Sequence, residues 1–328
     1  MKRKTAALAA ALTAMALCLT GCGGGDAPAS SEPQADTEAP AEEQTQPEEE
    51  PAPAEDGTED TAQVSDTAVL VVSFGTSYND SRDITIGAVE QAIADAHPEY
   101  EVRRAFTAQI IIDKLKERDG LEIDNVTEAL DRAVADGVQN LIVQPTHLMD
   151  GLEYMDLIGE LKEYKEDFAS ISVGDPLLTS DEDFEGVIKA ITDATKEYDD
   201  GETAIVFMGH GTEAESNQVY AAMQDKLTAD GFENYYIGTV EAEPSLDTVV
   251  AALKENGTYK KVVLEPLMVV AGDHANNDMA GDEEDSWKTA LEAEGYEVEC
   301  LLRGLGELED IQKIYVEHME QASADKLN

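Results

Sequence analysis

LIVQPTHLMDG at residues 141–151 and VVLEPLMVVAG at residues 262–272 are two versions of one segment. Each begins with a run of apolar residues, continues through a proline, and reaches a glycine six positions after that proline. A short continuous apolar run predicts a strand that is buried on both faces, as in a parallel sheet. His147 stands in the first copy where the second copy has Met268. We therefore expect a duplicated fold whose halves differ at a few loop positions.

A second pair of similar segments supports the duplication. AVLVVSFGTS at residues 68–77 resembles AIVFMGHGTE at residues 204–213, and His210 takes the position of Phe74. His147 and His210 both follow a predicted buried strand directly. An imidazole group can ligate a divalent metal or accept a proton near neutral pH. These two histidines are therefore the first candidates for catalysis and for metal binding.

Strand-like apolar runs alternate with helical periodicity along the rest of the chain. The expected strands are residues 68–74, 101–106, 140–145, 170–176, 203–209, 235–240, 260–266 and 296–302. This alternation predicts parallel sheets covered by helices and connected by right-handed crossovers. The predicted fold class is α/β, with two similar doubly wound, flavodoxin-like halves at 67–199 and 200–322, each built on a four-stranded parallel sheet. Ligands of such sheets bind beyond the carboxyl ends of the strands, so the active cleft should lie between the halves.

The first 66 residues are expected to lie outside this fold. Residues 1–22 combine the basic start MKRK, a short apolar stretch and LTGC, which predicts a lipoprotein signal peptide with lipidation at Cys22. Residues 23–66 are rich in proline and acidic residues and are predicted to form a disordered tether. The protein would then be exported and lipid-anchored, at the outer face of the cytoplasmic membrane or in the periplasm.

Composition narrows the range of partners. The formal net charge of the chain is −49, which argues against nucleic acid as a partner and is compatible with cations such as metal ions. The sequence contains no Walker motif and no GxGxxG motif, so neither ATP nor an organic cofactor is expected. His274, in the acidic loop AGDHANNDMAGDEED, could share a metal with Asp273 or Asp278. His97 and His318 are interpreted as surface residues.

Six segments together resemble the CbiK-type anaerobic cobaltochelatases, a family of class II tetrapyrrole chelatases. They are VVSFGTSYNDSRDITI, VRRAFTAQIIIDKL, VQPTHLMDGLEY, FMGHGTE, IGTVEAEPSL and PLMVVAGDHANNDMAGDEEDSW. The last of these is long and specific, and the resemblance extends over residues 68–322. It implies two α/β domains with an active cleft between them. It also implies insertion of Co²⁺, or of Fe²⁺ or Ni²⁺, into sirohydrochlorin or a related tetrapyrrole without ATP, on the route to cobalamin or sirohaem.

The resemblance also implies a set of site residues. The family's metal-binding histidines would be His147 and His210, and His274 would line the same cleft. A metal-binding carboxylate is expected at either Asp175 or Glu241.

The substrate implied by the resemblance carries several carboxylates, which require partners on the protein. Thr76 and Ser77, with the helix start that follows them, are candidates. Arg82, Arg103 and Arg104 are scarce positive charges in this acidic chain and are further candidates, although such residues also form ordinary surface pairs.

The family works in the cytoplasm, whereas this chain carries an export signal, so two interpretations stay open. In the first, the protein is a chelatase acting on a tetrapyrrole that reaches the cell surface. In the second, it is a surface-anchored protein that binds metal or haem, or another metallotetrapyrrole, and feeds a metal or corrinoid importer. Association into a homo-oligomer is compatible with both. We favour the chelatase because the motifs are intact.

Overall fold

The structure is a computed structural model and describes residues 66–328. The predicted signal peptide, the lipidation site at Cys22 and nearly all of the predicted tether lie outside these residues. Among the residues that are described, no helix has both the length and the apolar content needed to cross a bilayer.

The described chain contains two four-stranded sheets with the same strand order. The first has the order β2-β1-β3-β4 and the second β6-β5-β7-β8, and every neighbouring pair is parallel. The strands are β1 (Thr67–Ser73), β2 (Glu101–Phe106), β3 (Asn140–Pro145), β4 (Ser170–Val173), β5 (Thr203–Gly209), β6 (Tyr235–Thr239), β7 (Lys261–Pro266) and β8 (Glu297–Cys300). The eight predicted strands, the α/β class and the duplication are thereby confirmed.

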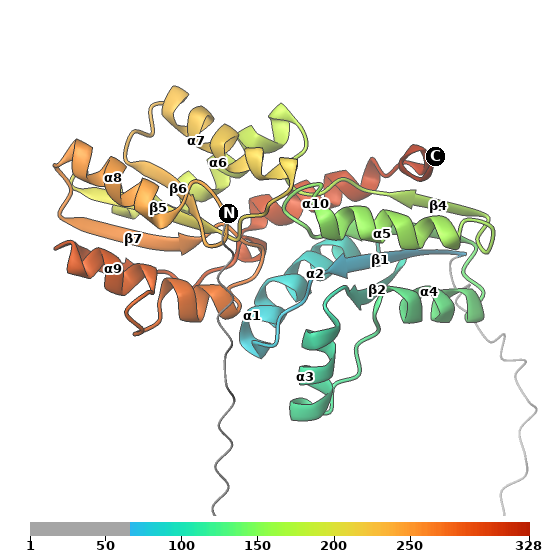
Figure 1. Ribbon diagram of the computed structural model, residues 1–328. Helices are drawn as coiled ribbons and strands as arrows, with labels where there is room; N and C mark the ends of the chain where they lie inside the picture. The colour runs from blue at the N-terminus through green and yellow to red at the C-terminus, as the bar shows by residue number, and fades with distance from the viewer. Residues whose placement is uncertain (1–65) are drawn as a thin grey trace, which may run out of the picture. The chain divides into compact units, whose positions relative to one another are not determined.

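Helices connect the strands and cover both faces of each sheet (Figure 1). They are α1 (Asn79–Ile84), α2 (Ile86–Ala96), α3 (Gln109–Asp119), α4 (Val126–Ala135), α5 (Leu152–Glu163), α6 (Asp181–Thr195), α7 (Gln218–Ala229), α8 (Leu246–Asn256), α9 (Trp287–Ala293) and α10 (Glu309–Glu320). A single π-helical turn, η3 (Ala275–Met279), precedes α9.

Alternation along β1 explains how one strand serves two cores. Val69 and Val71 point into a core that also contains Ile205 and Phe207 of β5, so this core is shared by the two halves. Ala68, Leu70 and Val72 point to the opposite face of the sheet, into a core that belongs to the first half. Successive side chains of a strand alternate between faces, and a strand apolar on both faces must be covered twice. One hydrophobic core therefore contacts both sheets.

The last helix crosses back from the second half to the first. Helix α10 packs against α2 and α6 and also contacts β3, and Figure 1 shows it in red beside the strands of the first half. The sequence prediction of a surface position for His318 on this helix is wrong. His318 is 7% exposed, and its Nε2 lies 2.8 Å from Asp183 Oδ1 of α6. Because the sequence alone does not reveal that α6 covers this face of α10, the acidic neighbours of His318 suggested exposure.

The carboxyl ends of the strands in the two sheets face the same region. In Figure 1 the arrowheads of β1 and β7 point toward each other across the middle of the molecule. The loop that follows β7 contacts helix α1, which comes after β1, since the Ala271 N–H donates a 3.0 Å hydrogen bond to Ser81 Oγ. The strand-end loops of both halves therefore meet where a ligand of the two halves would bind.

Candidate metal and tetrapyrrole site

Three potential metal ligands lie together at the carboxyl edge of the second sheet. Glu241 follows β6, His210 follows β5 and His274 follows β7, and these three strands are neighbours in the sheet. One ligand atom from each residue lies within 4.8 Å of the other two. Two imidazoles and one carboxylate form a ligand set that suits divalent cobalt, iron, nickel or zinc. We call His210, Glu241 and His274 the three-ligand cluster.

The glycines that flank His210 are required by its surroundings. A Cβ atom on Gly209 would lie 2.2 Å from the ring of Tyr220, and one on Gly211 would lie 2.8 Å from the backbone nitrogen of Ala242. Gly211 also has a φ of 86°, in the left-handed region that favours glycine. Only the sequence Gly-His-Gly therefore lets this loop run between α7 and the β6–α8 loop with the imidazole at its tip.

Backbone contacts bring Glu241 to His210. The N–H of Glu241 donates a 2.9 Å hydrogen bond to the carbonyl of His210, so the two residues are held side by side in neighbouring loops. The distance from His210 Nε2 to Glu241 Oε1 is 3.9 Å. Both side chains are about half exposed, so a hydrated cation can reach them from solvent.

Hydrogen bonds fix which nitrogen of each imidazole is available. His210 Nδ1 lies 2.7 Å from the carbonyl oxygen of Gly211, and His274 Nδ1 lies 2.5 Å from Asp278 Oδ2. A carbonyl and a carboxylate can only accept, so both Nδ1 atoms carry the proton. The lone pair then sits on Nε2 in both rings. A carboxylate behind a ligating histidine orients the ring, and Asp278 lies in this position behind His274.

His147 lies in the first half and is not part of the three-ligand cluster. Its backbone is fixed because the Leu177 N–H donates to its carbonyl at 3.0 Å, and the Tyr315 hydroxyl donates to the preceding carbonyl of Thr146 at 2.9 Å. Both ring nitrogens of His147 are buried and have no hydrogen-bond partner within the described part of the chain. Burial lowers the pKa of His147 to about 4, so the ring is neutral at neutral pH. A buried neutral imidazole with no partner offers a lone pair to a bound cation.

The two carboxylates considered from the sequence differ in their surroundings. Glu241 belongs to the three-ligand cluster, whereas Asp175 forms an ion pair with Lys326 near the C-terminus. The geometry therefore favours Glu241 as the carboxylate beside the metal.

The arginines that the sequence suggested for substrate binding are already paired. Arg82 is 7% exposed and donates to Asn79 and Asp83. Arg104 donates to Glu90 through both Nε and Nη2, and the remaining candidate, Arg103, pairs with Glu101 and Asp136. These three guanidinium groups are thus engaged with the protein's own carboxylates or amides.

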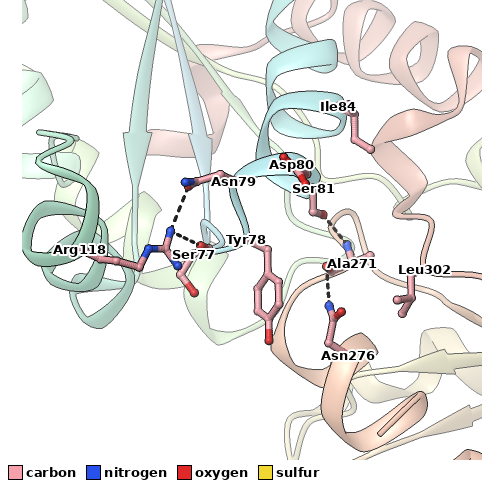
Figure 2. Close-up of a pocket in the computed structure, with 10 residues that line it drawn as sticks. All are labelled: Ser77, Tyr78, Asn79, Asp80, Ser81, Ile84, Arg118, Ala271, Asn276 and Leu302. Atoms are coloured by element: carbon pink, nitrogen blue, oxygen red, sulfur yellow. Dashed lines mark hydrogen bonds between the residues drawn. The ribbon is translucent and has the colours of Figure 1, made fainter.

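Thr76 and Ser77 are buried in the loop that follows β1, next to the loop that carries His274. A Cβ atom on Gly272 would lie 3.2 Å from Thr76 Oγ1. Ser77 lines a cavity of about 520 Å³ together with Tyr78, Arg118 and Asn276, as Figure 2 shows. Tyr78, which also lines the cavity, connects it to the loop that carries His274, since its hydroxyl donates to Asp273 Oδ1 at 3.4 Å.

Sequence reasoning missed Arg118 and Tyr78 and did not give Asp278 its role. For Asp278 a signal existed, because it stands four residues after His274 and so faces it on a helical turn. Arg118 lies at the end of α3 and reaches the Ser77 loop across 41 positions of sequence, so no local pattern indicates the contact.

An α/β protein of two facing halves, with imidazole and carboxylate ligands at its strand ends, has the architecture of a metal-handling protein that binds its ligand between the halves. The chain belongs to the cobalt chelatase (CbiK) family, whose model matches residues 67–324.

Curated relatives agree with this assignment. The sirohydrochlorin cobaltochelatase of Salmonella typhimurium is 39% identical over 255 residues, covering 78% of this chain and 96% of that protein. The sirohydrochlorin cobaltochelatase CbiKC of Nitratidesulfovibrio vulgaris is 32% identical over 256 residues, covering 77% of this chain and 89% of that protein. Among solved structures, SirB from Bacillus subtilis with Fe³⁺ matches with a TM-score of 0.55 at 14% identity, over 79% of this chain and 96% of that one. At that identity the last match shows the fold alone.

Proposed function

We propose that this protein is a metal chelatase that inserts Co²⁺ into sirohydrochlorin without ATP, on the route to cobalamin. Family membership and the two sirohydrochlorin cobaltochelatases among its relatives support the substrate and the metal. Fe²⁺ and Ni²⁺ are further candidate metals, because imidazole and carboxylate ligands suit them as well.

The observation that carries the proposal is the convergence of His210, Glu241 and His274 at the edge of one sheet, together with the unpartnered imidazole of His147 at a strand end of the other sheet. In this scheme the cluster takes up the metal dication from solvent. The tetrapyrrole lies between the halves, and its pyrrole nitrogens displace the cluster ligands one after another. His147 stays neutral at neutral pH and presents a lone pair to the cation from the other half. Catalysis then consists of positioning and proton transfer.

Charge balance gives the displaced ligands a second task. Insertion of a dication releases two pyrrole protons, which need acceptors beside the ring. As the metal moves onto the ring nitrogens, His210 and Glu241 lose their metal and become bases next to these protons. Both side chains are about half exposed, so they can pass the protons to solvent.

The test is anaerobic absorbance spectroscopy of the protein mixed with sirohydrochlorin and Co²⁺. We expect metallation well above the spontaneous rate, and a loss of at least 100-fold in the double variant His147→Ala/His210→Ala. The matched control is His97→Ala, since His97 lies at the end of α2 and contacts Glu99 and Glu320. A wild-type rate equal to the spontaneous rate would refute the proposal.

The competing function is a binding protein that captures metal, haem or another metallotetrapyrrole for an importer. The exported form predicted from residues 1–22 favours it. Stable uptake of haem with an axial-histidine spectrum, together with no turnover, would select it over the chelatase.

We also propose that the protein is exported and anchored by lipid on Cys22, at the outer face of the cytoplasmic membrane or in the periplasm. The small-residue motif LTGC ending at Cys22 supports this. Metabolic labelling with a radioactive fatty acid should mark the full-length protein and should not mark Cys22→Ala. Labelling of both proteins, or of neither, would contradict the anchor.

A further inference from the structure

We propose that Arg118 binds a peripheral carboxylate of the tetrapyrrole in the cavity beside η3, a role that rests on the proposed chelatase function. The substrate class is polyanionic and the chain has a formal net charge of −49, so binding requires a positioned cation. Arg82, Arg103 and Arg104 do not line the cavity beside η3. Arg118 is the one basic residue among those that line this cavity of about 520 Å³.

The cavity is adjacent to the three-ligand cluster. Its lining includes Asn276, which lies on η3 two residues after His274. It also includes Tyr78, whose hydroxyl donates to Asp273, the residue before His274. A macrocycle centred over the cluster therefore has its rim on the side of the cavity.

The guanidinium of Arg118 is held in place by three partners. Nη2 donates to the Ser77 carbonyl at 2.7 Å and to Asn79 Oδ1 at 3.1 Å, and Nε donates to Asp119 Oδ1 at 2.8 Å. Nη1 has no hydrogen bond to any described residue, and the side chain is 44% exposed. Figure 2 shows the side chain reaching the Ser77 loop at one end of the cavity. A preorganised guanidinium with one open nitrogen is suited to donate to an incoming carboxylate.

Neighbouring charges set the capacity of this subsite. Asp119 stays ionised, since the hydrogen bond from Arg118 lowers its pKa to about 2, and it balances much of the arginine's charge. Asp80 lines the same cavity and repels a second anion. The subsite therefore takes one carboxylate at the Arg118 end, through a directed charge-assisted hydrogen bond rather than through net charge.

The test measures binding of sirohydrochlorin to the metal-free protein by fluorescence quenching. We expect Arg118→Gln to raise Kd about fivefold to tenfold and to raise KM with kcat unchanged. The matched control is Arg132→Gln, because Arg132 of α4 forms a similar pair with Asp124 and lines neither this cavity nor the cluster. The affinity for Co²⁺ in the absence of tetrapyrrole should be the same in wild type, Arg118→Gln and Arg132→Gln.

A comparison of two ligands distinguishes carboxylate binding by Arg118 from a purely structural role. With the fully methyl-esterified tetrapyrrole, wild type and Arg118→Gln should bind equally, because the ester carries no carboxylate. Arg118→Lys keeps the positive charge but loses the planar guanidinium. Its Kd for sirohydrochlorin should lie between those of wild type and Arg118→Gln, and it replaces Arg118→Gln if that variant is unstable. The proposal would be overturned if wild type and both variants bound sirohydrochlorin with equal Kd values. It would also be overturned if Arg118→Gln weakened binding of the methyl ester as much as binding of sirohydrochlorin. A wild-type protein that binds the acid but fails to metallate it would instead refute the chelatase function.

Discussion

Glu241 and Asp175 were equivalent candidates for the metal-binding carboxylate on sequence grounds, and the structure separates them. Titration of the protein with Co²⁺, followed by its visible absorbance, should show that Glu241→Gln weakens cobalt binding by tenfold or more. Asp175→Asn is the control and should leave it unchanged, since Asp175 pairs with Lys326. If the two variants lose cobalt affinity equally, the three-ligand cluster is not the cobalt site.

Gly211 offers a second prediction at the scale of one residue. Gly211→Ala places a Cβ atom 2.8 Å from the Ala242 nitrogen in a backbone with φ 86°. We expect a loss of about 1–3 kcal/mol in the free energy of unfolding and a weaker cobalt titration, because the loop must move His210 away from Glu241.

Gly231→Ala is the matched control for Gly211→Ala. Its φ of 89° carries the same backbone strain, but a Cβ atom there would meet nothing within 4 Å. It should lose stability, by about 1 kcal/mol, and keep its cobalt affinity. If Gly211→Ala and Gly231→Ala bound Co²⁺ with equal affinity, the loop around His210 would tolerate the added methyl group.

The residue scale also shows where sequence reasoning stopped. Strand-end placement singled out His147, His210 and His274 because the carboxyl edge of a parallel sheet collects whatever follows each strand. The pattern could not show that His210 and His274 lie together while His147 is apart, because that depends on which loops touch. The pattern also did not decide between substrate binding and ordinary pairing for the arginines, although Arg82 pairs with Asn79 and Asp83 within α1 and Arg104 pairs with Glu90 of α2.

At the scale of elements, the contact between α6 and α10 depends on a buried pair. Asp183 and His318 have side chains that are each 9% exposed, with 2.8 Å between their atoms. Burial acts to raise the pKa of Asp183, but hydrogen bonds from His318 and Thr179 outweigh it, and the pKa is lowered. Removing one partner leaves the other buried without compensation, so Asp183→Asn should cost about 3 kcal/mol in urea unfolding at pH 7.

Two controls accompany Asp183→Asn, namely a substitution at an exposed position of the same helix and a pH series. Asp193→Asn on the same helix removes an exposed pair with Lys189 and should cost less than 0.5 kcal/mol. The folded pKa of Asp183 lies below its ordinary value of 3.8, so its ionisation stabilises the fold above that pH. The stability gap between wild type and Asp183→Asn should therefore narrow as the pH falls through the folded pKa. If Asp183→Asn lowered the free energy of unfolding no more than Asp193→Asn does, the Asp183–His318 pair would not stabilise the contact between α6 and α10.

Strand–helix alternation predicted all eight strands, since period and composition are local signals. The π-helical turn η3 was not predicted, because nothing in AGDHANNDMAGDEED distinguishes such a turn from a capped helix start. The course of α10 was not predicted either. Its apolar face fits any apolar surface, and only the assembled fold shows that this surface lies on the first half.

At the scale of the whole molecule, the two halves are not independent units. The largest core cluster combines residues of β1, α6, β5 and α10, and the Tyr315 hydroxyl of α10 donates to the Thr146 carbonyl beside His147. The C-terminal helix thus completes the first half and fixes one of its site loops. Duplication explains the repeated sheets, whereas the packing of α10 against α2 and β3 explains how the end of the chain contacts the first half.

Truncation tests this dependence. Deleting residues 305–328 removes α10, which packs against α2, α6 and β3, and the contacts of the C-terminal turn with β4, and so it exposes apolar residues of the shared core. We expect loss of cooperative thermal unfolding, because the exposed apolar surface exceeds what a domain of marginal stability can tolerate. Supplying residues 300–328 as a separate peptide should restore part of the transition, since the docking surface is made by the rest of the chain. A truncated protein that unfolds cooperatively near the wild-type temperature would mean that each half folds by itself, and the shared core would then stabilise only their relative position.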